Sequence, residues 1–273
     1  MNVDLHCHSN LSDGALSPKK LVDLAVERGV DMLSITDHDS IACYQQISQP
    51  TGDIKIVTGI EFSTTWCNRG IHIVGLNIDL NNTALLQGVN HQSIAREERA
   101  QKIADKLQNF GFENCLQGAE KFTEGGQLGR PHFARYLVEI GAVTTVQQAF
   151  KRYLGAGKAG DVKQHWADLE QVIAWIRSAG GIAVLAHPTK YNMTRTKLSE
   201  LLEQFMTMGG EGMEVISGSQ SPSVTQSMAA LCQKFGLLAS CGSDFHSPDQ
   251  PWAALGKVPA LPNQCKPVWS RWL

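Results

Sequence analysis

The chain has 273 residues, 42% of them hydrophobic, so it can bury a substantial core as one barrel-sized domain or as a domain with an insertion. Its 24 basic and 26 acidic residues give a formal net charge of -2, which excludes an overall basic surface, so a polyanionic substrate would have to be bound locally. Seven cysteines without a C-x-x-C pair argue against a disulfide framework or a zinc knuckle, and no apolar run reaches the length of a membrane span, so we expect a cytoplasmic protein.

The first predicted strand, residues 3–8, alternates apolar with polar residues. His6 and His8 therefore share one face of the strand, about 7 Å apart, which allows both to bind one metal ion. The turn over residues 10–14 returns Asp13 toward the end of the strand as an oxygen ligand. Because a His-x-His pair is a weak signal by itself, the prediction depends on further ligands along the chain.

The next strands also lead into potential metal ligands. After a helix predicted between the first two strands, residues 31–36 run into an Asp-His-Asp sequence centred on His38, and the apolar residues 54–60 end at Glu61. An Asn-Arg-Gly turn signal then predicts a hairpin whose return strand carries His72 back toward Glu61.

Helical periodicity replaces this pattern from about residue 83 to residue 167, which we interpret as an inserted helical subdomain. Its first helix is predicted to have an apolar face that includes Ile94 and Phe110 and a charged, solvated face that includes Arg96 and Arg99. Residues 1–82 and 168–273 then form the main domain.

Strands and helices alternate again after residue 168. Helices are expected at 169–179, 196–208 and 223–235, and strands at 182–186, 212–216 and 237–241. The first of these strands leads into His187, and the last leads into Asp244 and His246. Six or seven such units in a ring predict an α/β barrel with its functional site at the carboxyl ends of the strands.

Nine residues of the kinds that bind metal ions follow or lie in the predicted strands. They are His6, His8, Asp13, His38, Glu61, His72, His187, Asp244 and His246. Histidines scattered for packing would not fall so often directly after apolar strands, so we expect the set to form a metal cluster. Asp37 and Asp39, on either side of His38, either orient ligand histidines or cap a helix.

The motifs that contain these residues follow one another along the chain from residue 4 to residue 246. They are D-L-H-C-H-S-N-L-S-D-G, I-T-D-H-D, G-I-E-F-S, I-H-I-V-G-L, L-A-H-P and G-S-D-F-H. In this order they resemble the motifs of the PHP (polymerase and histidinol phosphatase) family of metal-dependent phosphoesterases. The resemblance implies a distorted (β/α)7 barrel with the segment 83–167 as an inserted helical cap.

The resemblance also implies two or three divalent metal ions in the cluster. One would be held by His6, His8, Glu61 and Asp244, a second by Asp13, His38 and His246, and a third by Glu61, His72 and His187. Mixed imidazole and carboxylate ligands suit manganese, our first choice, and also iron or zinc. The expected nucleophile is a metal-bound hydroxide, supported by Asp13, His38 and His246.

The inserted segment resembles one branch of this family. G-R-P-H-F-A-R-Y-L-V-E at 129–139 and F-K-R-Y-L-G-A-G-K-A-G at 150–160 are similar to the branch that hydrolyses 3',5'-nucleoside bisphosphates and digests 5'-phosphorylated RNA in the 5'-to-3' direction, including the 5' ends of ribosomal RNA. The implied partners are therefore these two substrates, without a membrane or an obligate protein partner.

A substrate with two phosphates needs a second anion site besides the metals. Arg130, His132 and Arg135 fit this task, with Lys158 as a further candidate, and we expect them to bind the 5'-phosphate. Arg130 combines a guanidinium group with the free amides of a predicted helix start. The alternative is that Arg130 is an ordinary charged residue on the surface of a helix and binds no ligand.

Three other interpretations share parts of this pattern. A phosphatase of a small phosphomonoester such as histidinol phosphate would use the same metal ligands but would not need the Arg130 segment. A non-catalytic module of a polymerase would be expected to show eroded ligands and a longer chain. A regulatory protein that binds metal or nucleotide would be distinguished from an enzyme by a turnover assay.

Overall fold

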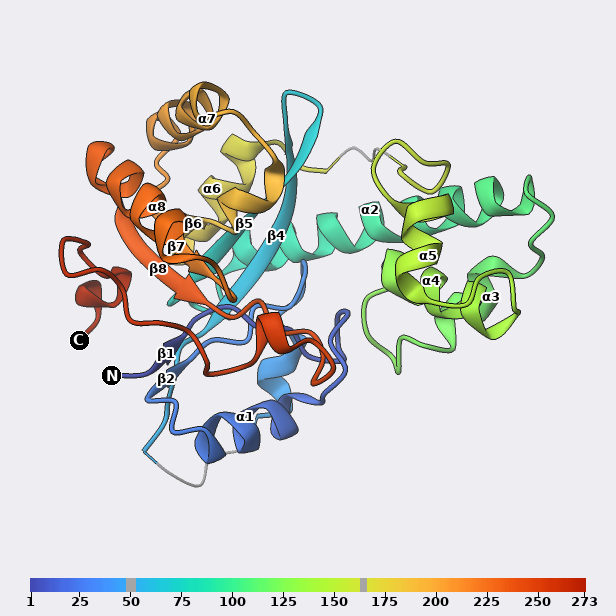
Figure 1. Cartoon of the computed structure of the whole chain (residues 1–273), viewed down its shortest axis with the longest axis horizontal. Coiled ribbons are helices and arrows are strands. Elements are labelled where there is room, and N and C mark those ends of the chain that lie inside the picture. The colour runs from blue at the N-terminus through green and yellow to red at the C-terminus, as the bar shows by residue number, and fades with distance from the viewer. Residues whose placement is uncertain (48–52, 163–165) are drawn as a thin grey trace.

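The computed structural model describes residues 1–47, 53–162 and 166–273 and has a mixed α/β fold (Figure 1). Two β-sheets and their helices form the main domain, and a group of helices stands apart from the sheets. The long helix α2, Thr83–Gln108, runs from the sheets into this group. Within the described residues, no helix is both long enough and apolar enough to cross a membrane.

The smaller sheet contains the first three strands, all parallel. They are β1 (Val3–Asp4), β2 (Met32–Leu33) and β3 (Lys55–Ile56), in the order β1-β2-β3. Helix α1, Pro18–Glu27, connects the first two, and Ser17 caps it by accepting a hydrogen bond from the amide of Lys20. A short 3-10 helix, η1 (Ala42–Gln45), follows β2. The strands are shorter than predicted, but backbone hydrogen bonds continue past their ends toward the functional site, as from Thr36 to Cys7 (2.8 Å).

The larger sheet has five strands in sequence order. They are β4 (Gly59–Trp66), β5 (Arg69–Leu76), β6 (Ile182–Leu185), β7 (Gly212–Ser217) and β8 (Leu238–Gly242). Strand β5 is antiparallel to both neighbours, and β6, β7 and β8 are parallel. The predicted hairpin is confirmed as β4–β5, although its turn residues are Cys67 and Asn68, whose φ angles of 46° and 59° suit a tight two-residue turn. Glu61 lies inside β4 and not, as predicted, at the end of a strand.

Backbone hydrogen bonds join the two sheets at two seams. Between β1 and β8, the amide of Leu5 donates to Cys241 (3.0 Å). Beyond β2, the amide of Asp39 donates to Glu61 in β4 (2.9 Å). These seams bring the segments that follow β1, β2 and β8 next to the middle of β4, and this is where the predicted metal ligands lie.

Three helices of the main domain bury their apolar faces against the larger sheet. They are α6 (Leu169–Ser178), α7 (Arg195–Thr207) and α8 (Pro222–Lys234), with the 3-10 turns η3 (Pro188–Tyr191), η4 (Pro251–Ala253) and η5 (Val268–Arg271) in the connections and the C-terminal segment. Phe205 of α7 and Ile176 of α6 are fully buried in one core with Phe62 of β4. The predicted alternation of strands and helices after residue 168 is therefore confirmed.

The helical subdomain has a separate core. Helices α3 (Cys115–Glu120), α4 (Arg130–Glu139), α5 (Val146–Ala149) and a π-helical turn, η2 (Phe150–Leu154), pack on the second half of α2. Its centre includes Leu107, Phe133 and Leu137, all fully buried. The boundaries at residues 82–83 and 167–168 stay a prediction.

The prediction for the faces of α2 was partly wrong. Ile94 and Phe110 are 51% and 54% exposed, whereas Arg96 is only 8% exposed. The reason is that the first half of α2 packs closely on the main domain through small residues. At Gly88 there is no room for a side chain, since a Cβ atom there would lie 2.5 Å from the ring of Trp175. This close approach allows Arg96 to reach the buried carboxylate of Asp39.

Candidate metal centre

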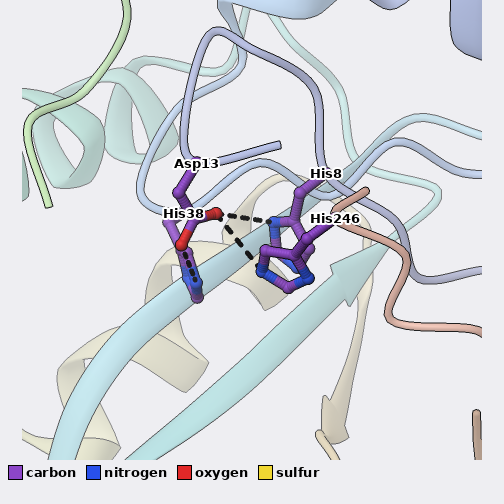
Figure 2. Close-up of side chains that lie close together, drawn as sticks. All are labelled: His8, Asp13, His38 and His246. Carbon is purple, nitrogen blue, oxygen red and sulfur yellow. Dashed lines mark ion pairs between the residues drawn. The ribbon is translucent and has the colours of Figure 1, made fainter. Parts of the chain in front are cut away.

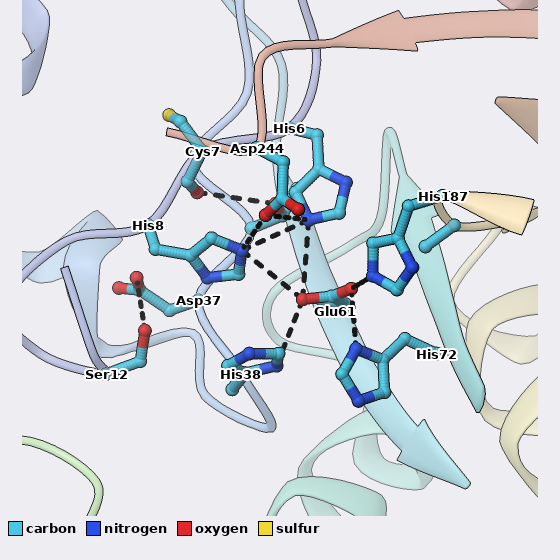
Figure 3. Close-up of polar contacts among 12 residues, drawn as sticks. His6, Cys7, His8, Ser12, Asp37, His38, Glu61, His72, His187 and Asp244 are labelled. Atoms are coloured by element: carbon cyan, nitrogen blue, oxygen red, sulfur yellow. Dashed lines mark hydrogen bonds and ion pairs between the residues drawn. The ribbon is translucent and has the colours of Figure 1, made fainter. Parts of the chain in front are cut away.

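Glu61 lies at the centre of the predicted ligands (Figure 3). Its side chain is fully buried in β4. One oxygen, Oε2, lies 3.3 Å from the Nε2 atoms of both His6 and His8 and 3.0 Å from Nδ1 of His38. The ends of β1 and β2 thus deliver three imidazole rings to one side of this carboxylate.

The other oxygen of Glu61 faces two further histidines. Oε1 lies 2.9 Å from Nδ1 of His72 and 2.9 Å from Nε2 of His187. His72 comes from β5, and His187 follows β6 with a positive φ of 28° that turns the chain sharply. Because its two oxygens face different histidines, Glu61 has the geometry of a bridging carboxylate.

Asp244, directly after β8, completes the group around His6 and His8. Its Oδ1 lies 3.5 Å from Nε2 of His6 and 3.3 Å from Nε2 of His8. Asp244 has a φ of 53° and donates its amide to the carbonyl of His6 (2.8 Å), which fixes its side chain at the β1–β8 seam. Its second oxygen forms an ion pair with Lys190.

A second group forms around Asp13 (Figure 2). Its carboxylate lies 3.3 Å from His246, 3.8 Å from His38 and 3.9 Å from His8. The rings of His8 and His246 stack with centroids 4.2 Å apart. One ligand atom from each of these four residues lies within 4.8 Å of all the others, close enough to share one ion. The structure thus brings all nine predicted residues together, and their role as ligands stays a prediction.

Several atoms in this cluster are better suited to a cation than to hydrogen bonds. Within the described residues, Oε2 of Glu61 and Nδ1 of His38 are buried without a hydrogen-bond partner although they lie close together. The Nε2 atoms of His6 and His8 face each other at 3.1 Å. A buried carboxylate oxygen is costly unless a cation or a hydrogen-bond donor lies beside it, and an imidazole lone pair can bind the same cation. The donor set of imidazoles and carboxylates therefore fits divalent ions such as manganese, iron or zinc.

The surroundings keep the three acids of the cluster ionised. Burial by itself raises the pKa values of Asp13, Glu61 and Asp244. The nearby histidines outweigh this effect and hold each pKa well below its usual range. All three are therefore charged at neutral pH, as metal binding requires.

His8 and His246, although their rings stack, have opposite pKa shifts. Burial and the positive charge of His246 lower the pKa of His8 to about 3, so its ring is neutral at pH 7 and has a free lone pair. Burial also lowers the pKa of His246, but Asp13 outweighs it and raises this pKa to about 9. Binding of a cation beside Asp13 would therefore release a proton from His246.

Glu214 supports the centre from β7 and was not predicted. Its carboxylate accepts hydrogen bonds from Nδ1 of His6 (2.5 Å) and from the amide of His187 (2.6 Å). Carboxylates in this position orient a ligand histidine and raise its basicity. The signal in the sequence was a single acidic residue inside an otherwise apolar strand, whereas the predicted ligands were sought at strand ends.

Asp37 and Asp39 have roles that differ from both alternatives considered in the sequence. Asp37 accepts hydrogen bonds from the amide and hydroxyl of Ser9 (both 2.6 Å) and the hydroxyl of Ser12 (3.0 Å), and so fixes the loop that carries Asp13. Asp39 accepts from Nε of Arg96 (2.7 Å) and thereby ties α2 to the main domain.

A cleft of about 790 Å³ opens from the metal centre toward the helical subdomain. Its lining includes Asp13, His38 and His72 from the metal centre and Arg99 and Arg130 from the subdomain. Candidate metal ligands and basic side chains thus share one cavity.

The basic wall of the cleft contains more positive charge than its neighbours neutralise. Arg130 donates to the carbonyl of Leu154 (3.2 Å) and lies 3.7 Å from the carboxylate of Asp161. Arg99 donates to the carbonyl of Val162 (3.1 Å). Burial, together with the charges of Arg130 and Arg96, lowers the pKa of Arg99 to about 9. An anion bound in the cleft would relieve this repulsion.

The other residues predicted to bind substrate lie outside this lining. The ring of His132 is buried and accepts a hydrogen bond from the amide of Gly129 (2.9 Å) at the start of α4. Arg135 is half-buried on the same helix. Lys158 is exposed and lines a separate hollow with Arg152. Sequence reasoning missed Arg99, which was assigned to a solvated helix face.

Comparison with known proteins identifies the family. A sequence model described as the PHP domain matches residues 4–181, more than half of the chain. The chain belongs to the PHP domain family. It is 46% identical to a 5'-3' exoribonuclease of Haemophilus influenzae, with 98% of both chains covered. It is 40% identical to a 3',5'-nucleoside bisphosphate phosphatase of Chromobacterium violaceum, with 98% of this chain and 95% of that protein covered.

A solved structure is similar to this chain in both fold and sequence. An amidohydrolase from Chromobacterium violaceum, with bound sulfate and no metal, has a TM-score of 0.91 and 39% identity over 99% of this chain and 95% of that chain. The family prediction is thus confirmed. The exoribonuclease and the bisphosphate phosphatase are both hydrolases of phosphate esters. The predicted enzyme class is therefore also confirmed.

Replacement of Glu214 tests its support of the metal centre. We expect Glu214→Gln to weaken metal affinity about 10- to 100-fold, because His6 loses the carboxylate that orients its ring. Metal content after dialysis against a series of chelator concentrations, measured by plasma mass spectrometry, gives the affinity. Glu211→Gln is the matched control, since Glu211 is 38% exposed and pairs with Arg271 at the surface. Equal metal retention in the two variants would contradict this role.

Proposed function

We propose that this PHP protein hydrolyses the 3'-phosphate of 3',5'-nucleoside bisphosphates, such as pAp to AMP and phosphate, and removes nucleotides from the 5' end of 5'-phosphorylated RNA, including ribosomal RNA. One observation carries the proposal: the same cleft is lined by candidate metal ligands on one side and by Arg99 and Arg130 on the other. A nucleotide with a phosphate on each side of its ribose can contact both sides at once. The names of the two relatives support the same substrates.

We further propose that the strands act as one distorted (β/α)7 barrel, with β3 and β4 as a single interrupted strand and the segment 83–167 as its cap. The hydrogen bonds at the β1–β8 and β2–β4 seams support this arrangement. The cap would place the basic wall over the carboxyl ends of the strands, where sites of such barrels lie.

The metal ligands are proposed in three groups, and Glu61 belongs to the first and the third. They are His6, His8, Glu61 and Asp244; Asp13, His38 and His246; and Glu61, His72 and His187. Divalent ions held there, with manganese as our first choice, supply an activated water molecule and neutralise charge on the phosphoryl group. Lys190, half-exposed in the cleft, adds a positive charge beside Asp244.

The basic wall would select substrates by their 5'-phosphate. Arg130 and Arg99 present guanidinium groups that suit a phosphate dianion, and His132 holds the start of α4 in place. Arg135 and Lys158 would contribute positive charge from outside the cleft.

The two substrates require the same reaction. In pAp and in RNA, the bond between phosphorus and the 3'-oxygen breaks, and the 3'-oxygen leaves on a nucleoside 5'-monophosphate. In RNA the remaining chain carries a new 5'-phosphate, so it can bind again and lose one nucleotide at a time. A phosphatase of a small phosphomonoester would use the metal centre but leave the basic wall without a role.

The cytoplasm is the compartment we propose for this activity. All seven cysteines are free, in keeping with a reducing environment. The proposal invokes no protein partner.

A product assay tests the proposed function. The manganese-loaded protein is expected to convert pAp to AMP and phosphate and to shorten RNA from its 5' end only when that end carries a phosphate. Chromatography of the products from matched RNAs with 5'-phosphate or 5'-hydroxyl ends measures both activities. Equal cleavage of the two RNAs, or of simple phosphomonoesters, would contradict the selection by a 5'-phosphate.

A variant of Arg130 tests the basic wall. We expect Arg130→Gln to lower kcat/KM for pAp roughly 10- to 100-fold, the effect of losing a charged hydrogen bond, while hydrolysis of 3'-AMP changes less than about twofold. The reason is that 3'-AMP has no 5'-phosphate for Arg130 to bind. Steady-state kinetics on both nucleotides provide the measurement, with Arg152→Gln, an exposed arginine of the same subdomain, as control. An equal loss on both nucleotides would show that Arg130 serves another purpose.

A further inference from the structure

We propose that RNA beyond the scissile phosphate leaves the cleft over the β4–β5 hairpin and the segment 188–197, where Arg69 and Lys197 bind its phosphates. This inference rests on the proposed function, because it concerns the RNA substrate of the same site. It assigns Arg69 and Lys197 a role in exonuclease activity that the hydrolysis of a free bisphosphate does not require.

The positions of the two anion sites determine the direction of the chain. The 5'-phosphate is proposed to bind Arg99 and Arg130 on the subdomain wall, and the next phosphate lies at the metal centre. The RNA that continues from there must leave away from the subdomain. On that side the cleft is lined by Arg69 and Gly70 of the hairpin and by Lys190 and Asn192.

The hairpin and the neighbouring segment form one ordered surface. Arg69 pairs with Trp66 across the two-residue turn, and its Nη1 donates to the carbonyl of Tyr191 (3.4 Å). The hydroxyl of Tyr191 accepts from the amide of His72 (2.9 Å) and donates to the carbonyl of Ala186 (2.8 Å). Arg69 is therefore held at a defined place beside the strand that carries the metal ligand His72.

The charge of this surface fits a nucleic acid backbone. Arg69 is exposed, and within the described residues no carboxylate lies within ion-pair distance of it. Lys197 lies with its Nζ 4.8 Å from the ring centre of Trp66, the residue that pairs with Arg69 across the hairpin turn, and it also forms an ion pair with Glu200 (2.7 Å). Positive side chains along a groove are the usual means of binding single-stranded nucleic acid. Because the whole chain has a net charge of -2, its binding of RNA has to depend on a local patch of this kind.

Two substrates of different length test the inference. Arg69→Ala is expected to lower kcat/KM for a 5'-phosphorylated hexanucleotide about tenfold and to change that for pAp less than about twofold. Arg69→Ala with Lys197→Ala is expected to lower the hexanucleotide value further. The slope of log KM against log salt for the hexanucleotide should become shallower by ~0.7 for each phosphate that the variant no longer binds. Arg69→Lys should retain most of the activity because it keeps the charge.

Arg152→Ala is the matched control, because it removes an exposed arginine of the subdomain that lines a hollow separate from the cleft. Unchanged hexanucleotide kinetics in Arg69→Ala, or an equal loss on pAp, would overturn the inference. A loss on RNA in Arg152→Ala alone would also overturn it, since RNA would then leave over the subdomain. A wild-type protein that hydrolyses neither substrate would instead contradict the proposed function itself. Turnover of pAp by each variant shows that it is folded.

Discussion

The buried negative charge of Glu61 is the constraint on which the rest of the structure depends. A carboxylate without solvent is costly by several kcal/mol unless opposite charges or hydrogen bonds surround it. Here five imidazole rings lie within 3.3 Å of its two oxygens. They come from segments far apart in the sequence, so the two sheets must meet at both seams for the site to exist. Every strand of the larger sheet, or the segment directly after it, contributes a side chain to this centre or supports one.

The second constraint is the fixed spacing between the metal centre and the basic wall. Helix α2 is attached to the main domain by Arg96, which pairs with Asp39, and by Gln92, whose amide donates to the same aspartate (3.0 Å). The subdomain also touches the loop that carries Asp13, since the amide of Gln127 donates to the carbonyl of Leu11 (2.9 Å). These contacts hold the candidate metal centre and the basic wall at one separation. If the proposed function is correct, the cleft would distinguish substrates by the distance between their phosphates.

The gathering of the candidate metal ligands was predictable from the sequence because these residues follow a local pattern. His6, His38 and His187 stand directly after short apolar runs, and the carboxyl ends of neighbouring strands meet in space. Glu61 was found in the same way, although it lies inside β4.

The supporting residues were harder to predict, because their roles depend on contacts between distant segments. Arg96 and Arg99 have the spacing of a solvated helix face and became part of the cleft only because α2 packs on both domains. Glu214 is a lone acid in a buried strand, and its partner His6 lies at the other end of the chain.

Arg130 was found because glycine and proline mark the start of its helix. The position of Lys158 outside the cleft depends on the path of the segment 155–161, which no periodic pattern defines.

The most direct test of the two-site cleft is a crystal structure of the manganese-loaded protein with the product AMP. The account predicts anomalous density at the cluster around Glu61, the 5'-phosphate within hydrogen-bond distance of Arg99 or Arg130, and the ribose 3'-hydroxyl directed toward the metal centre. A 5'-phosphate bound at the metal centre, with no contact to either arginine, would contradict the account.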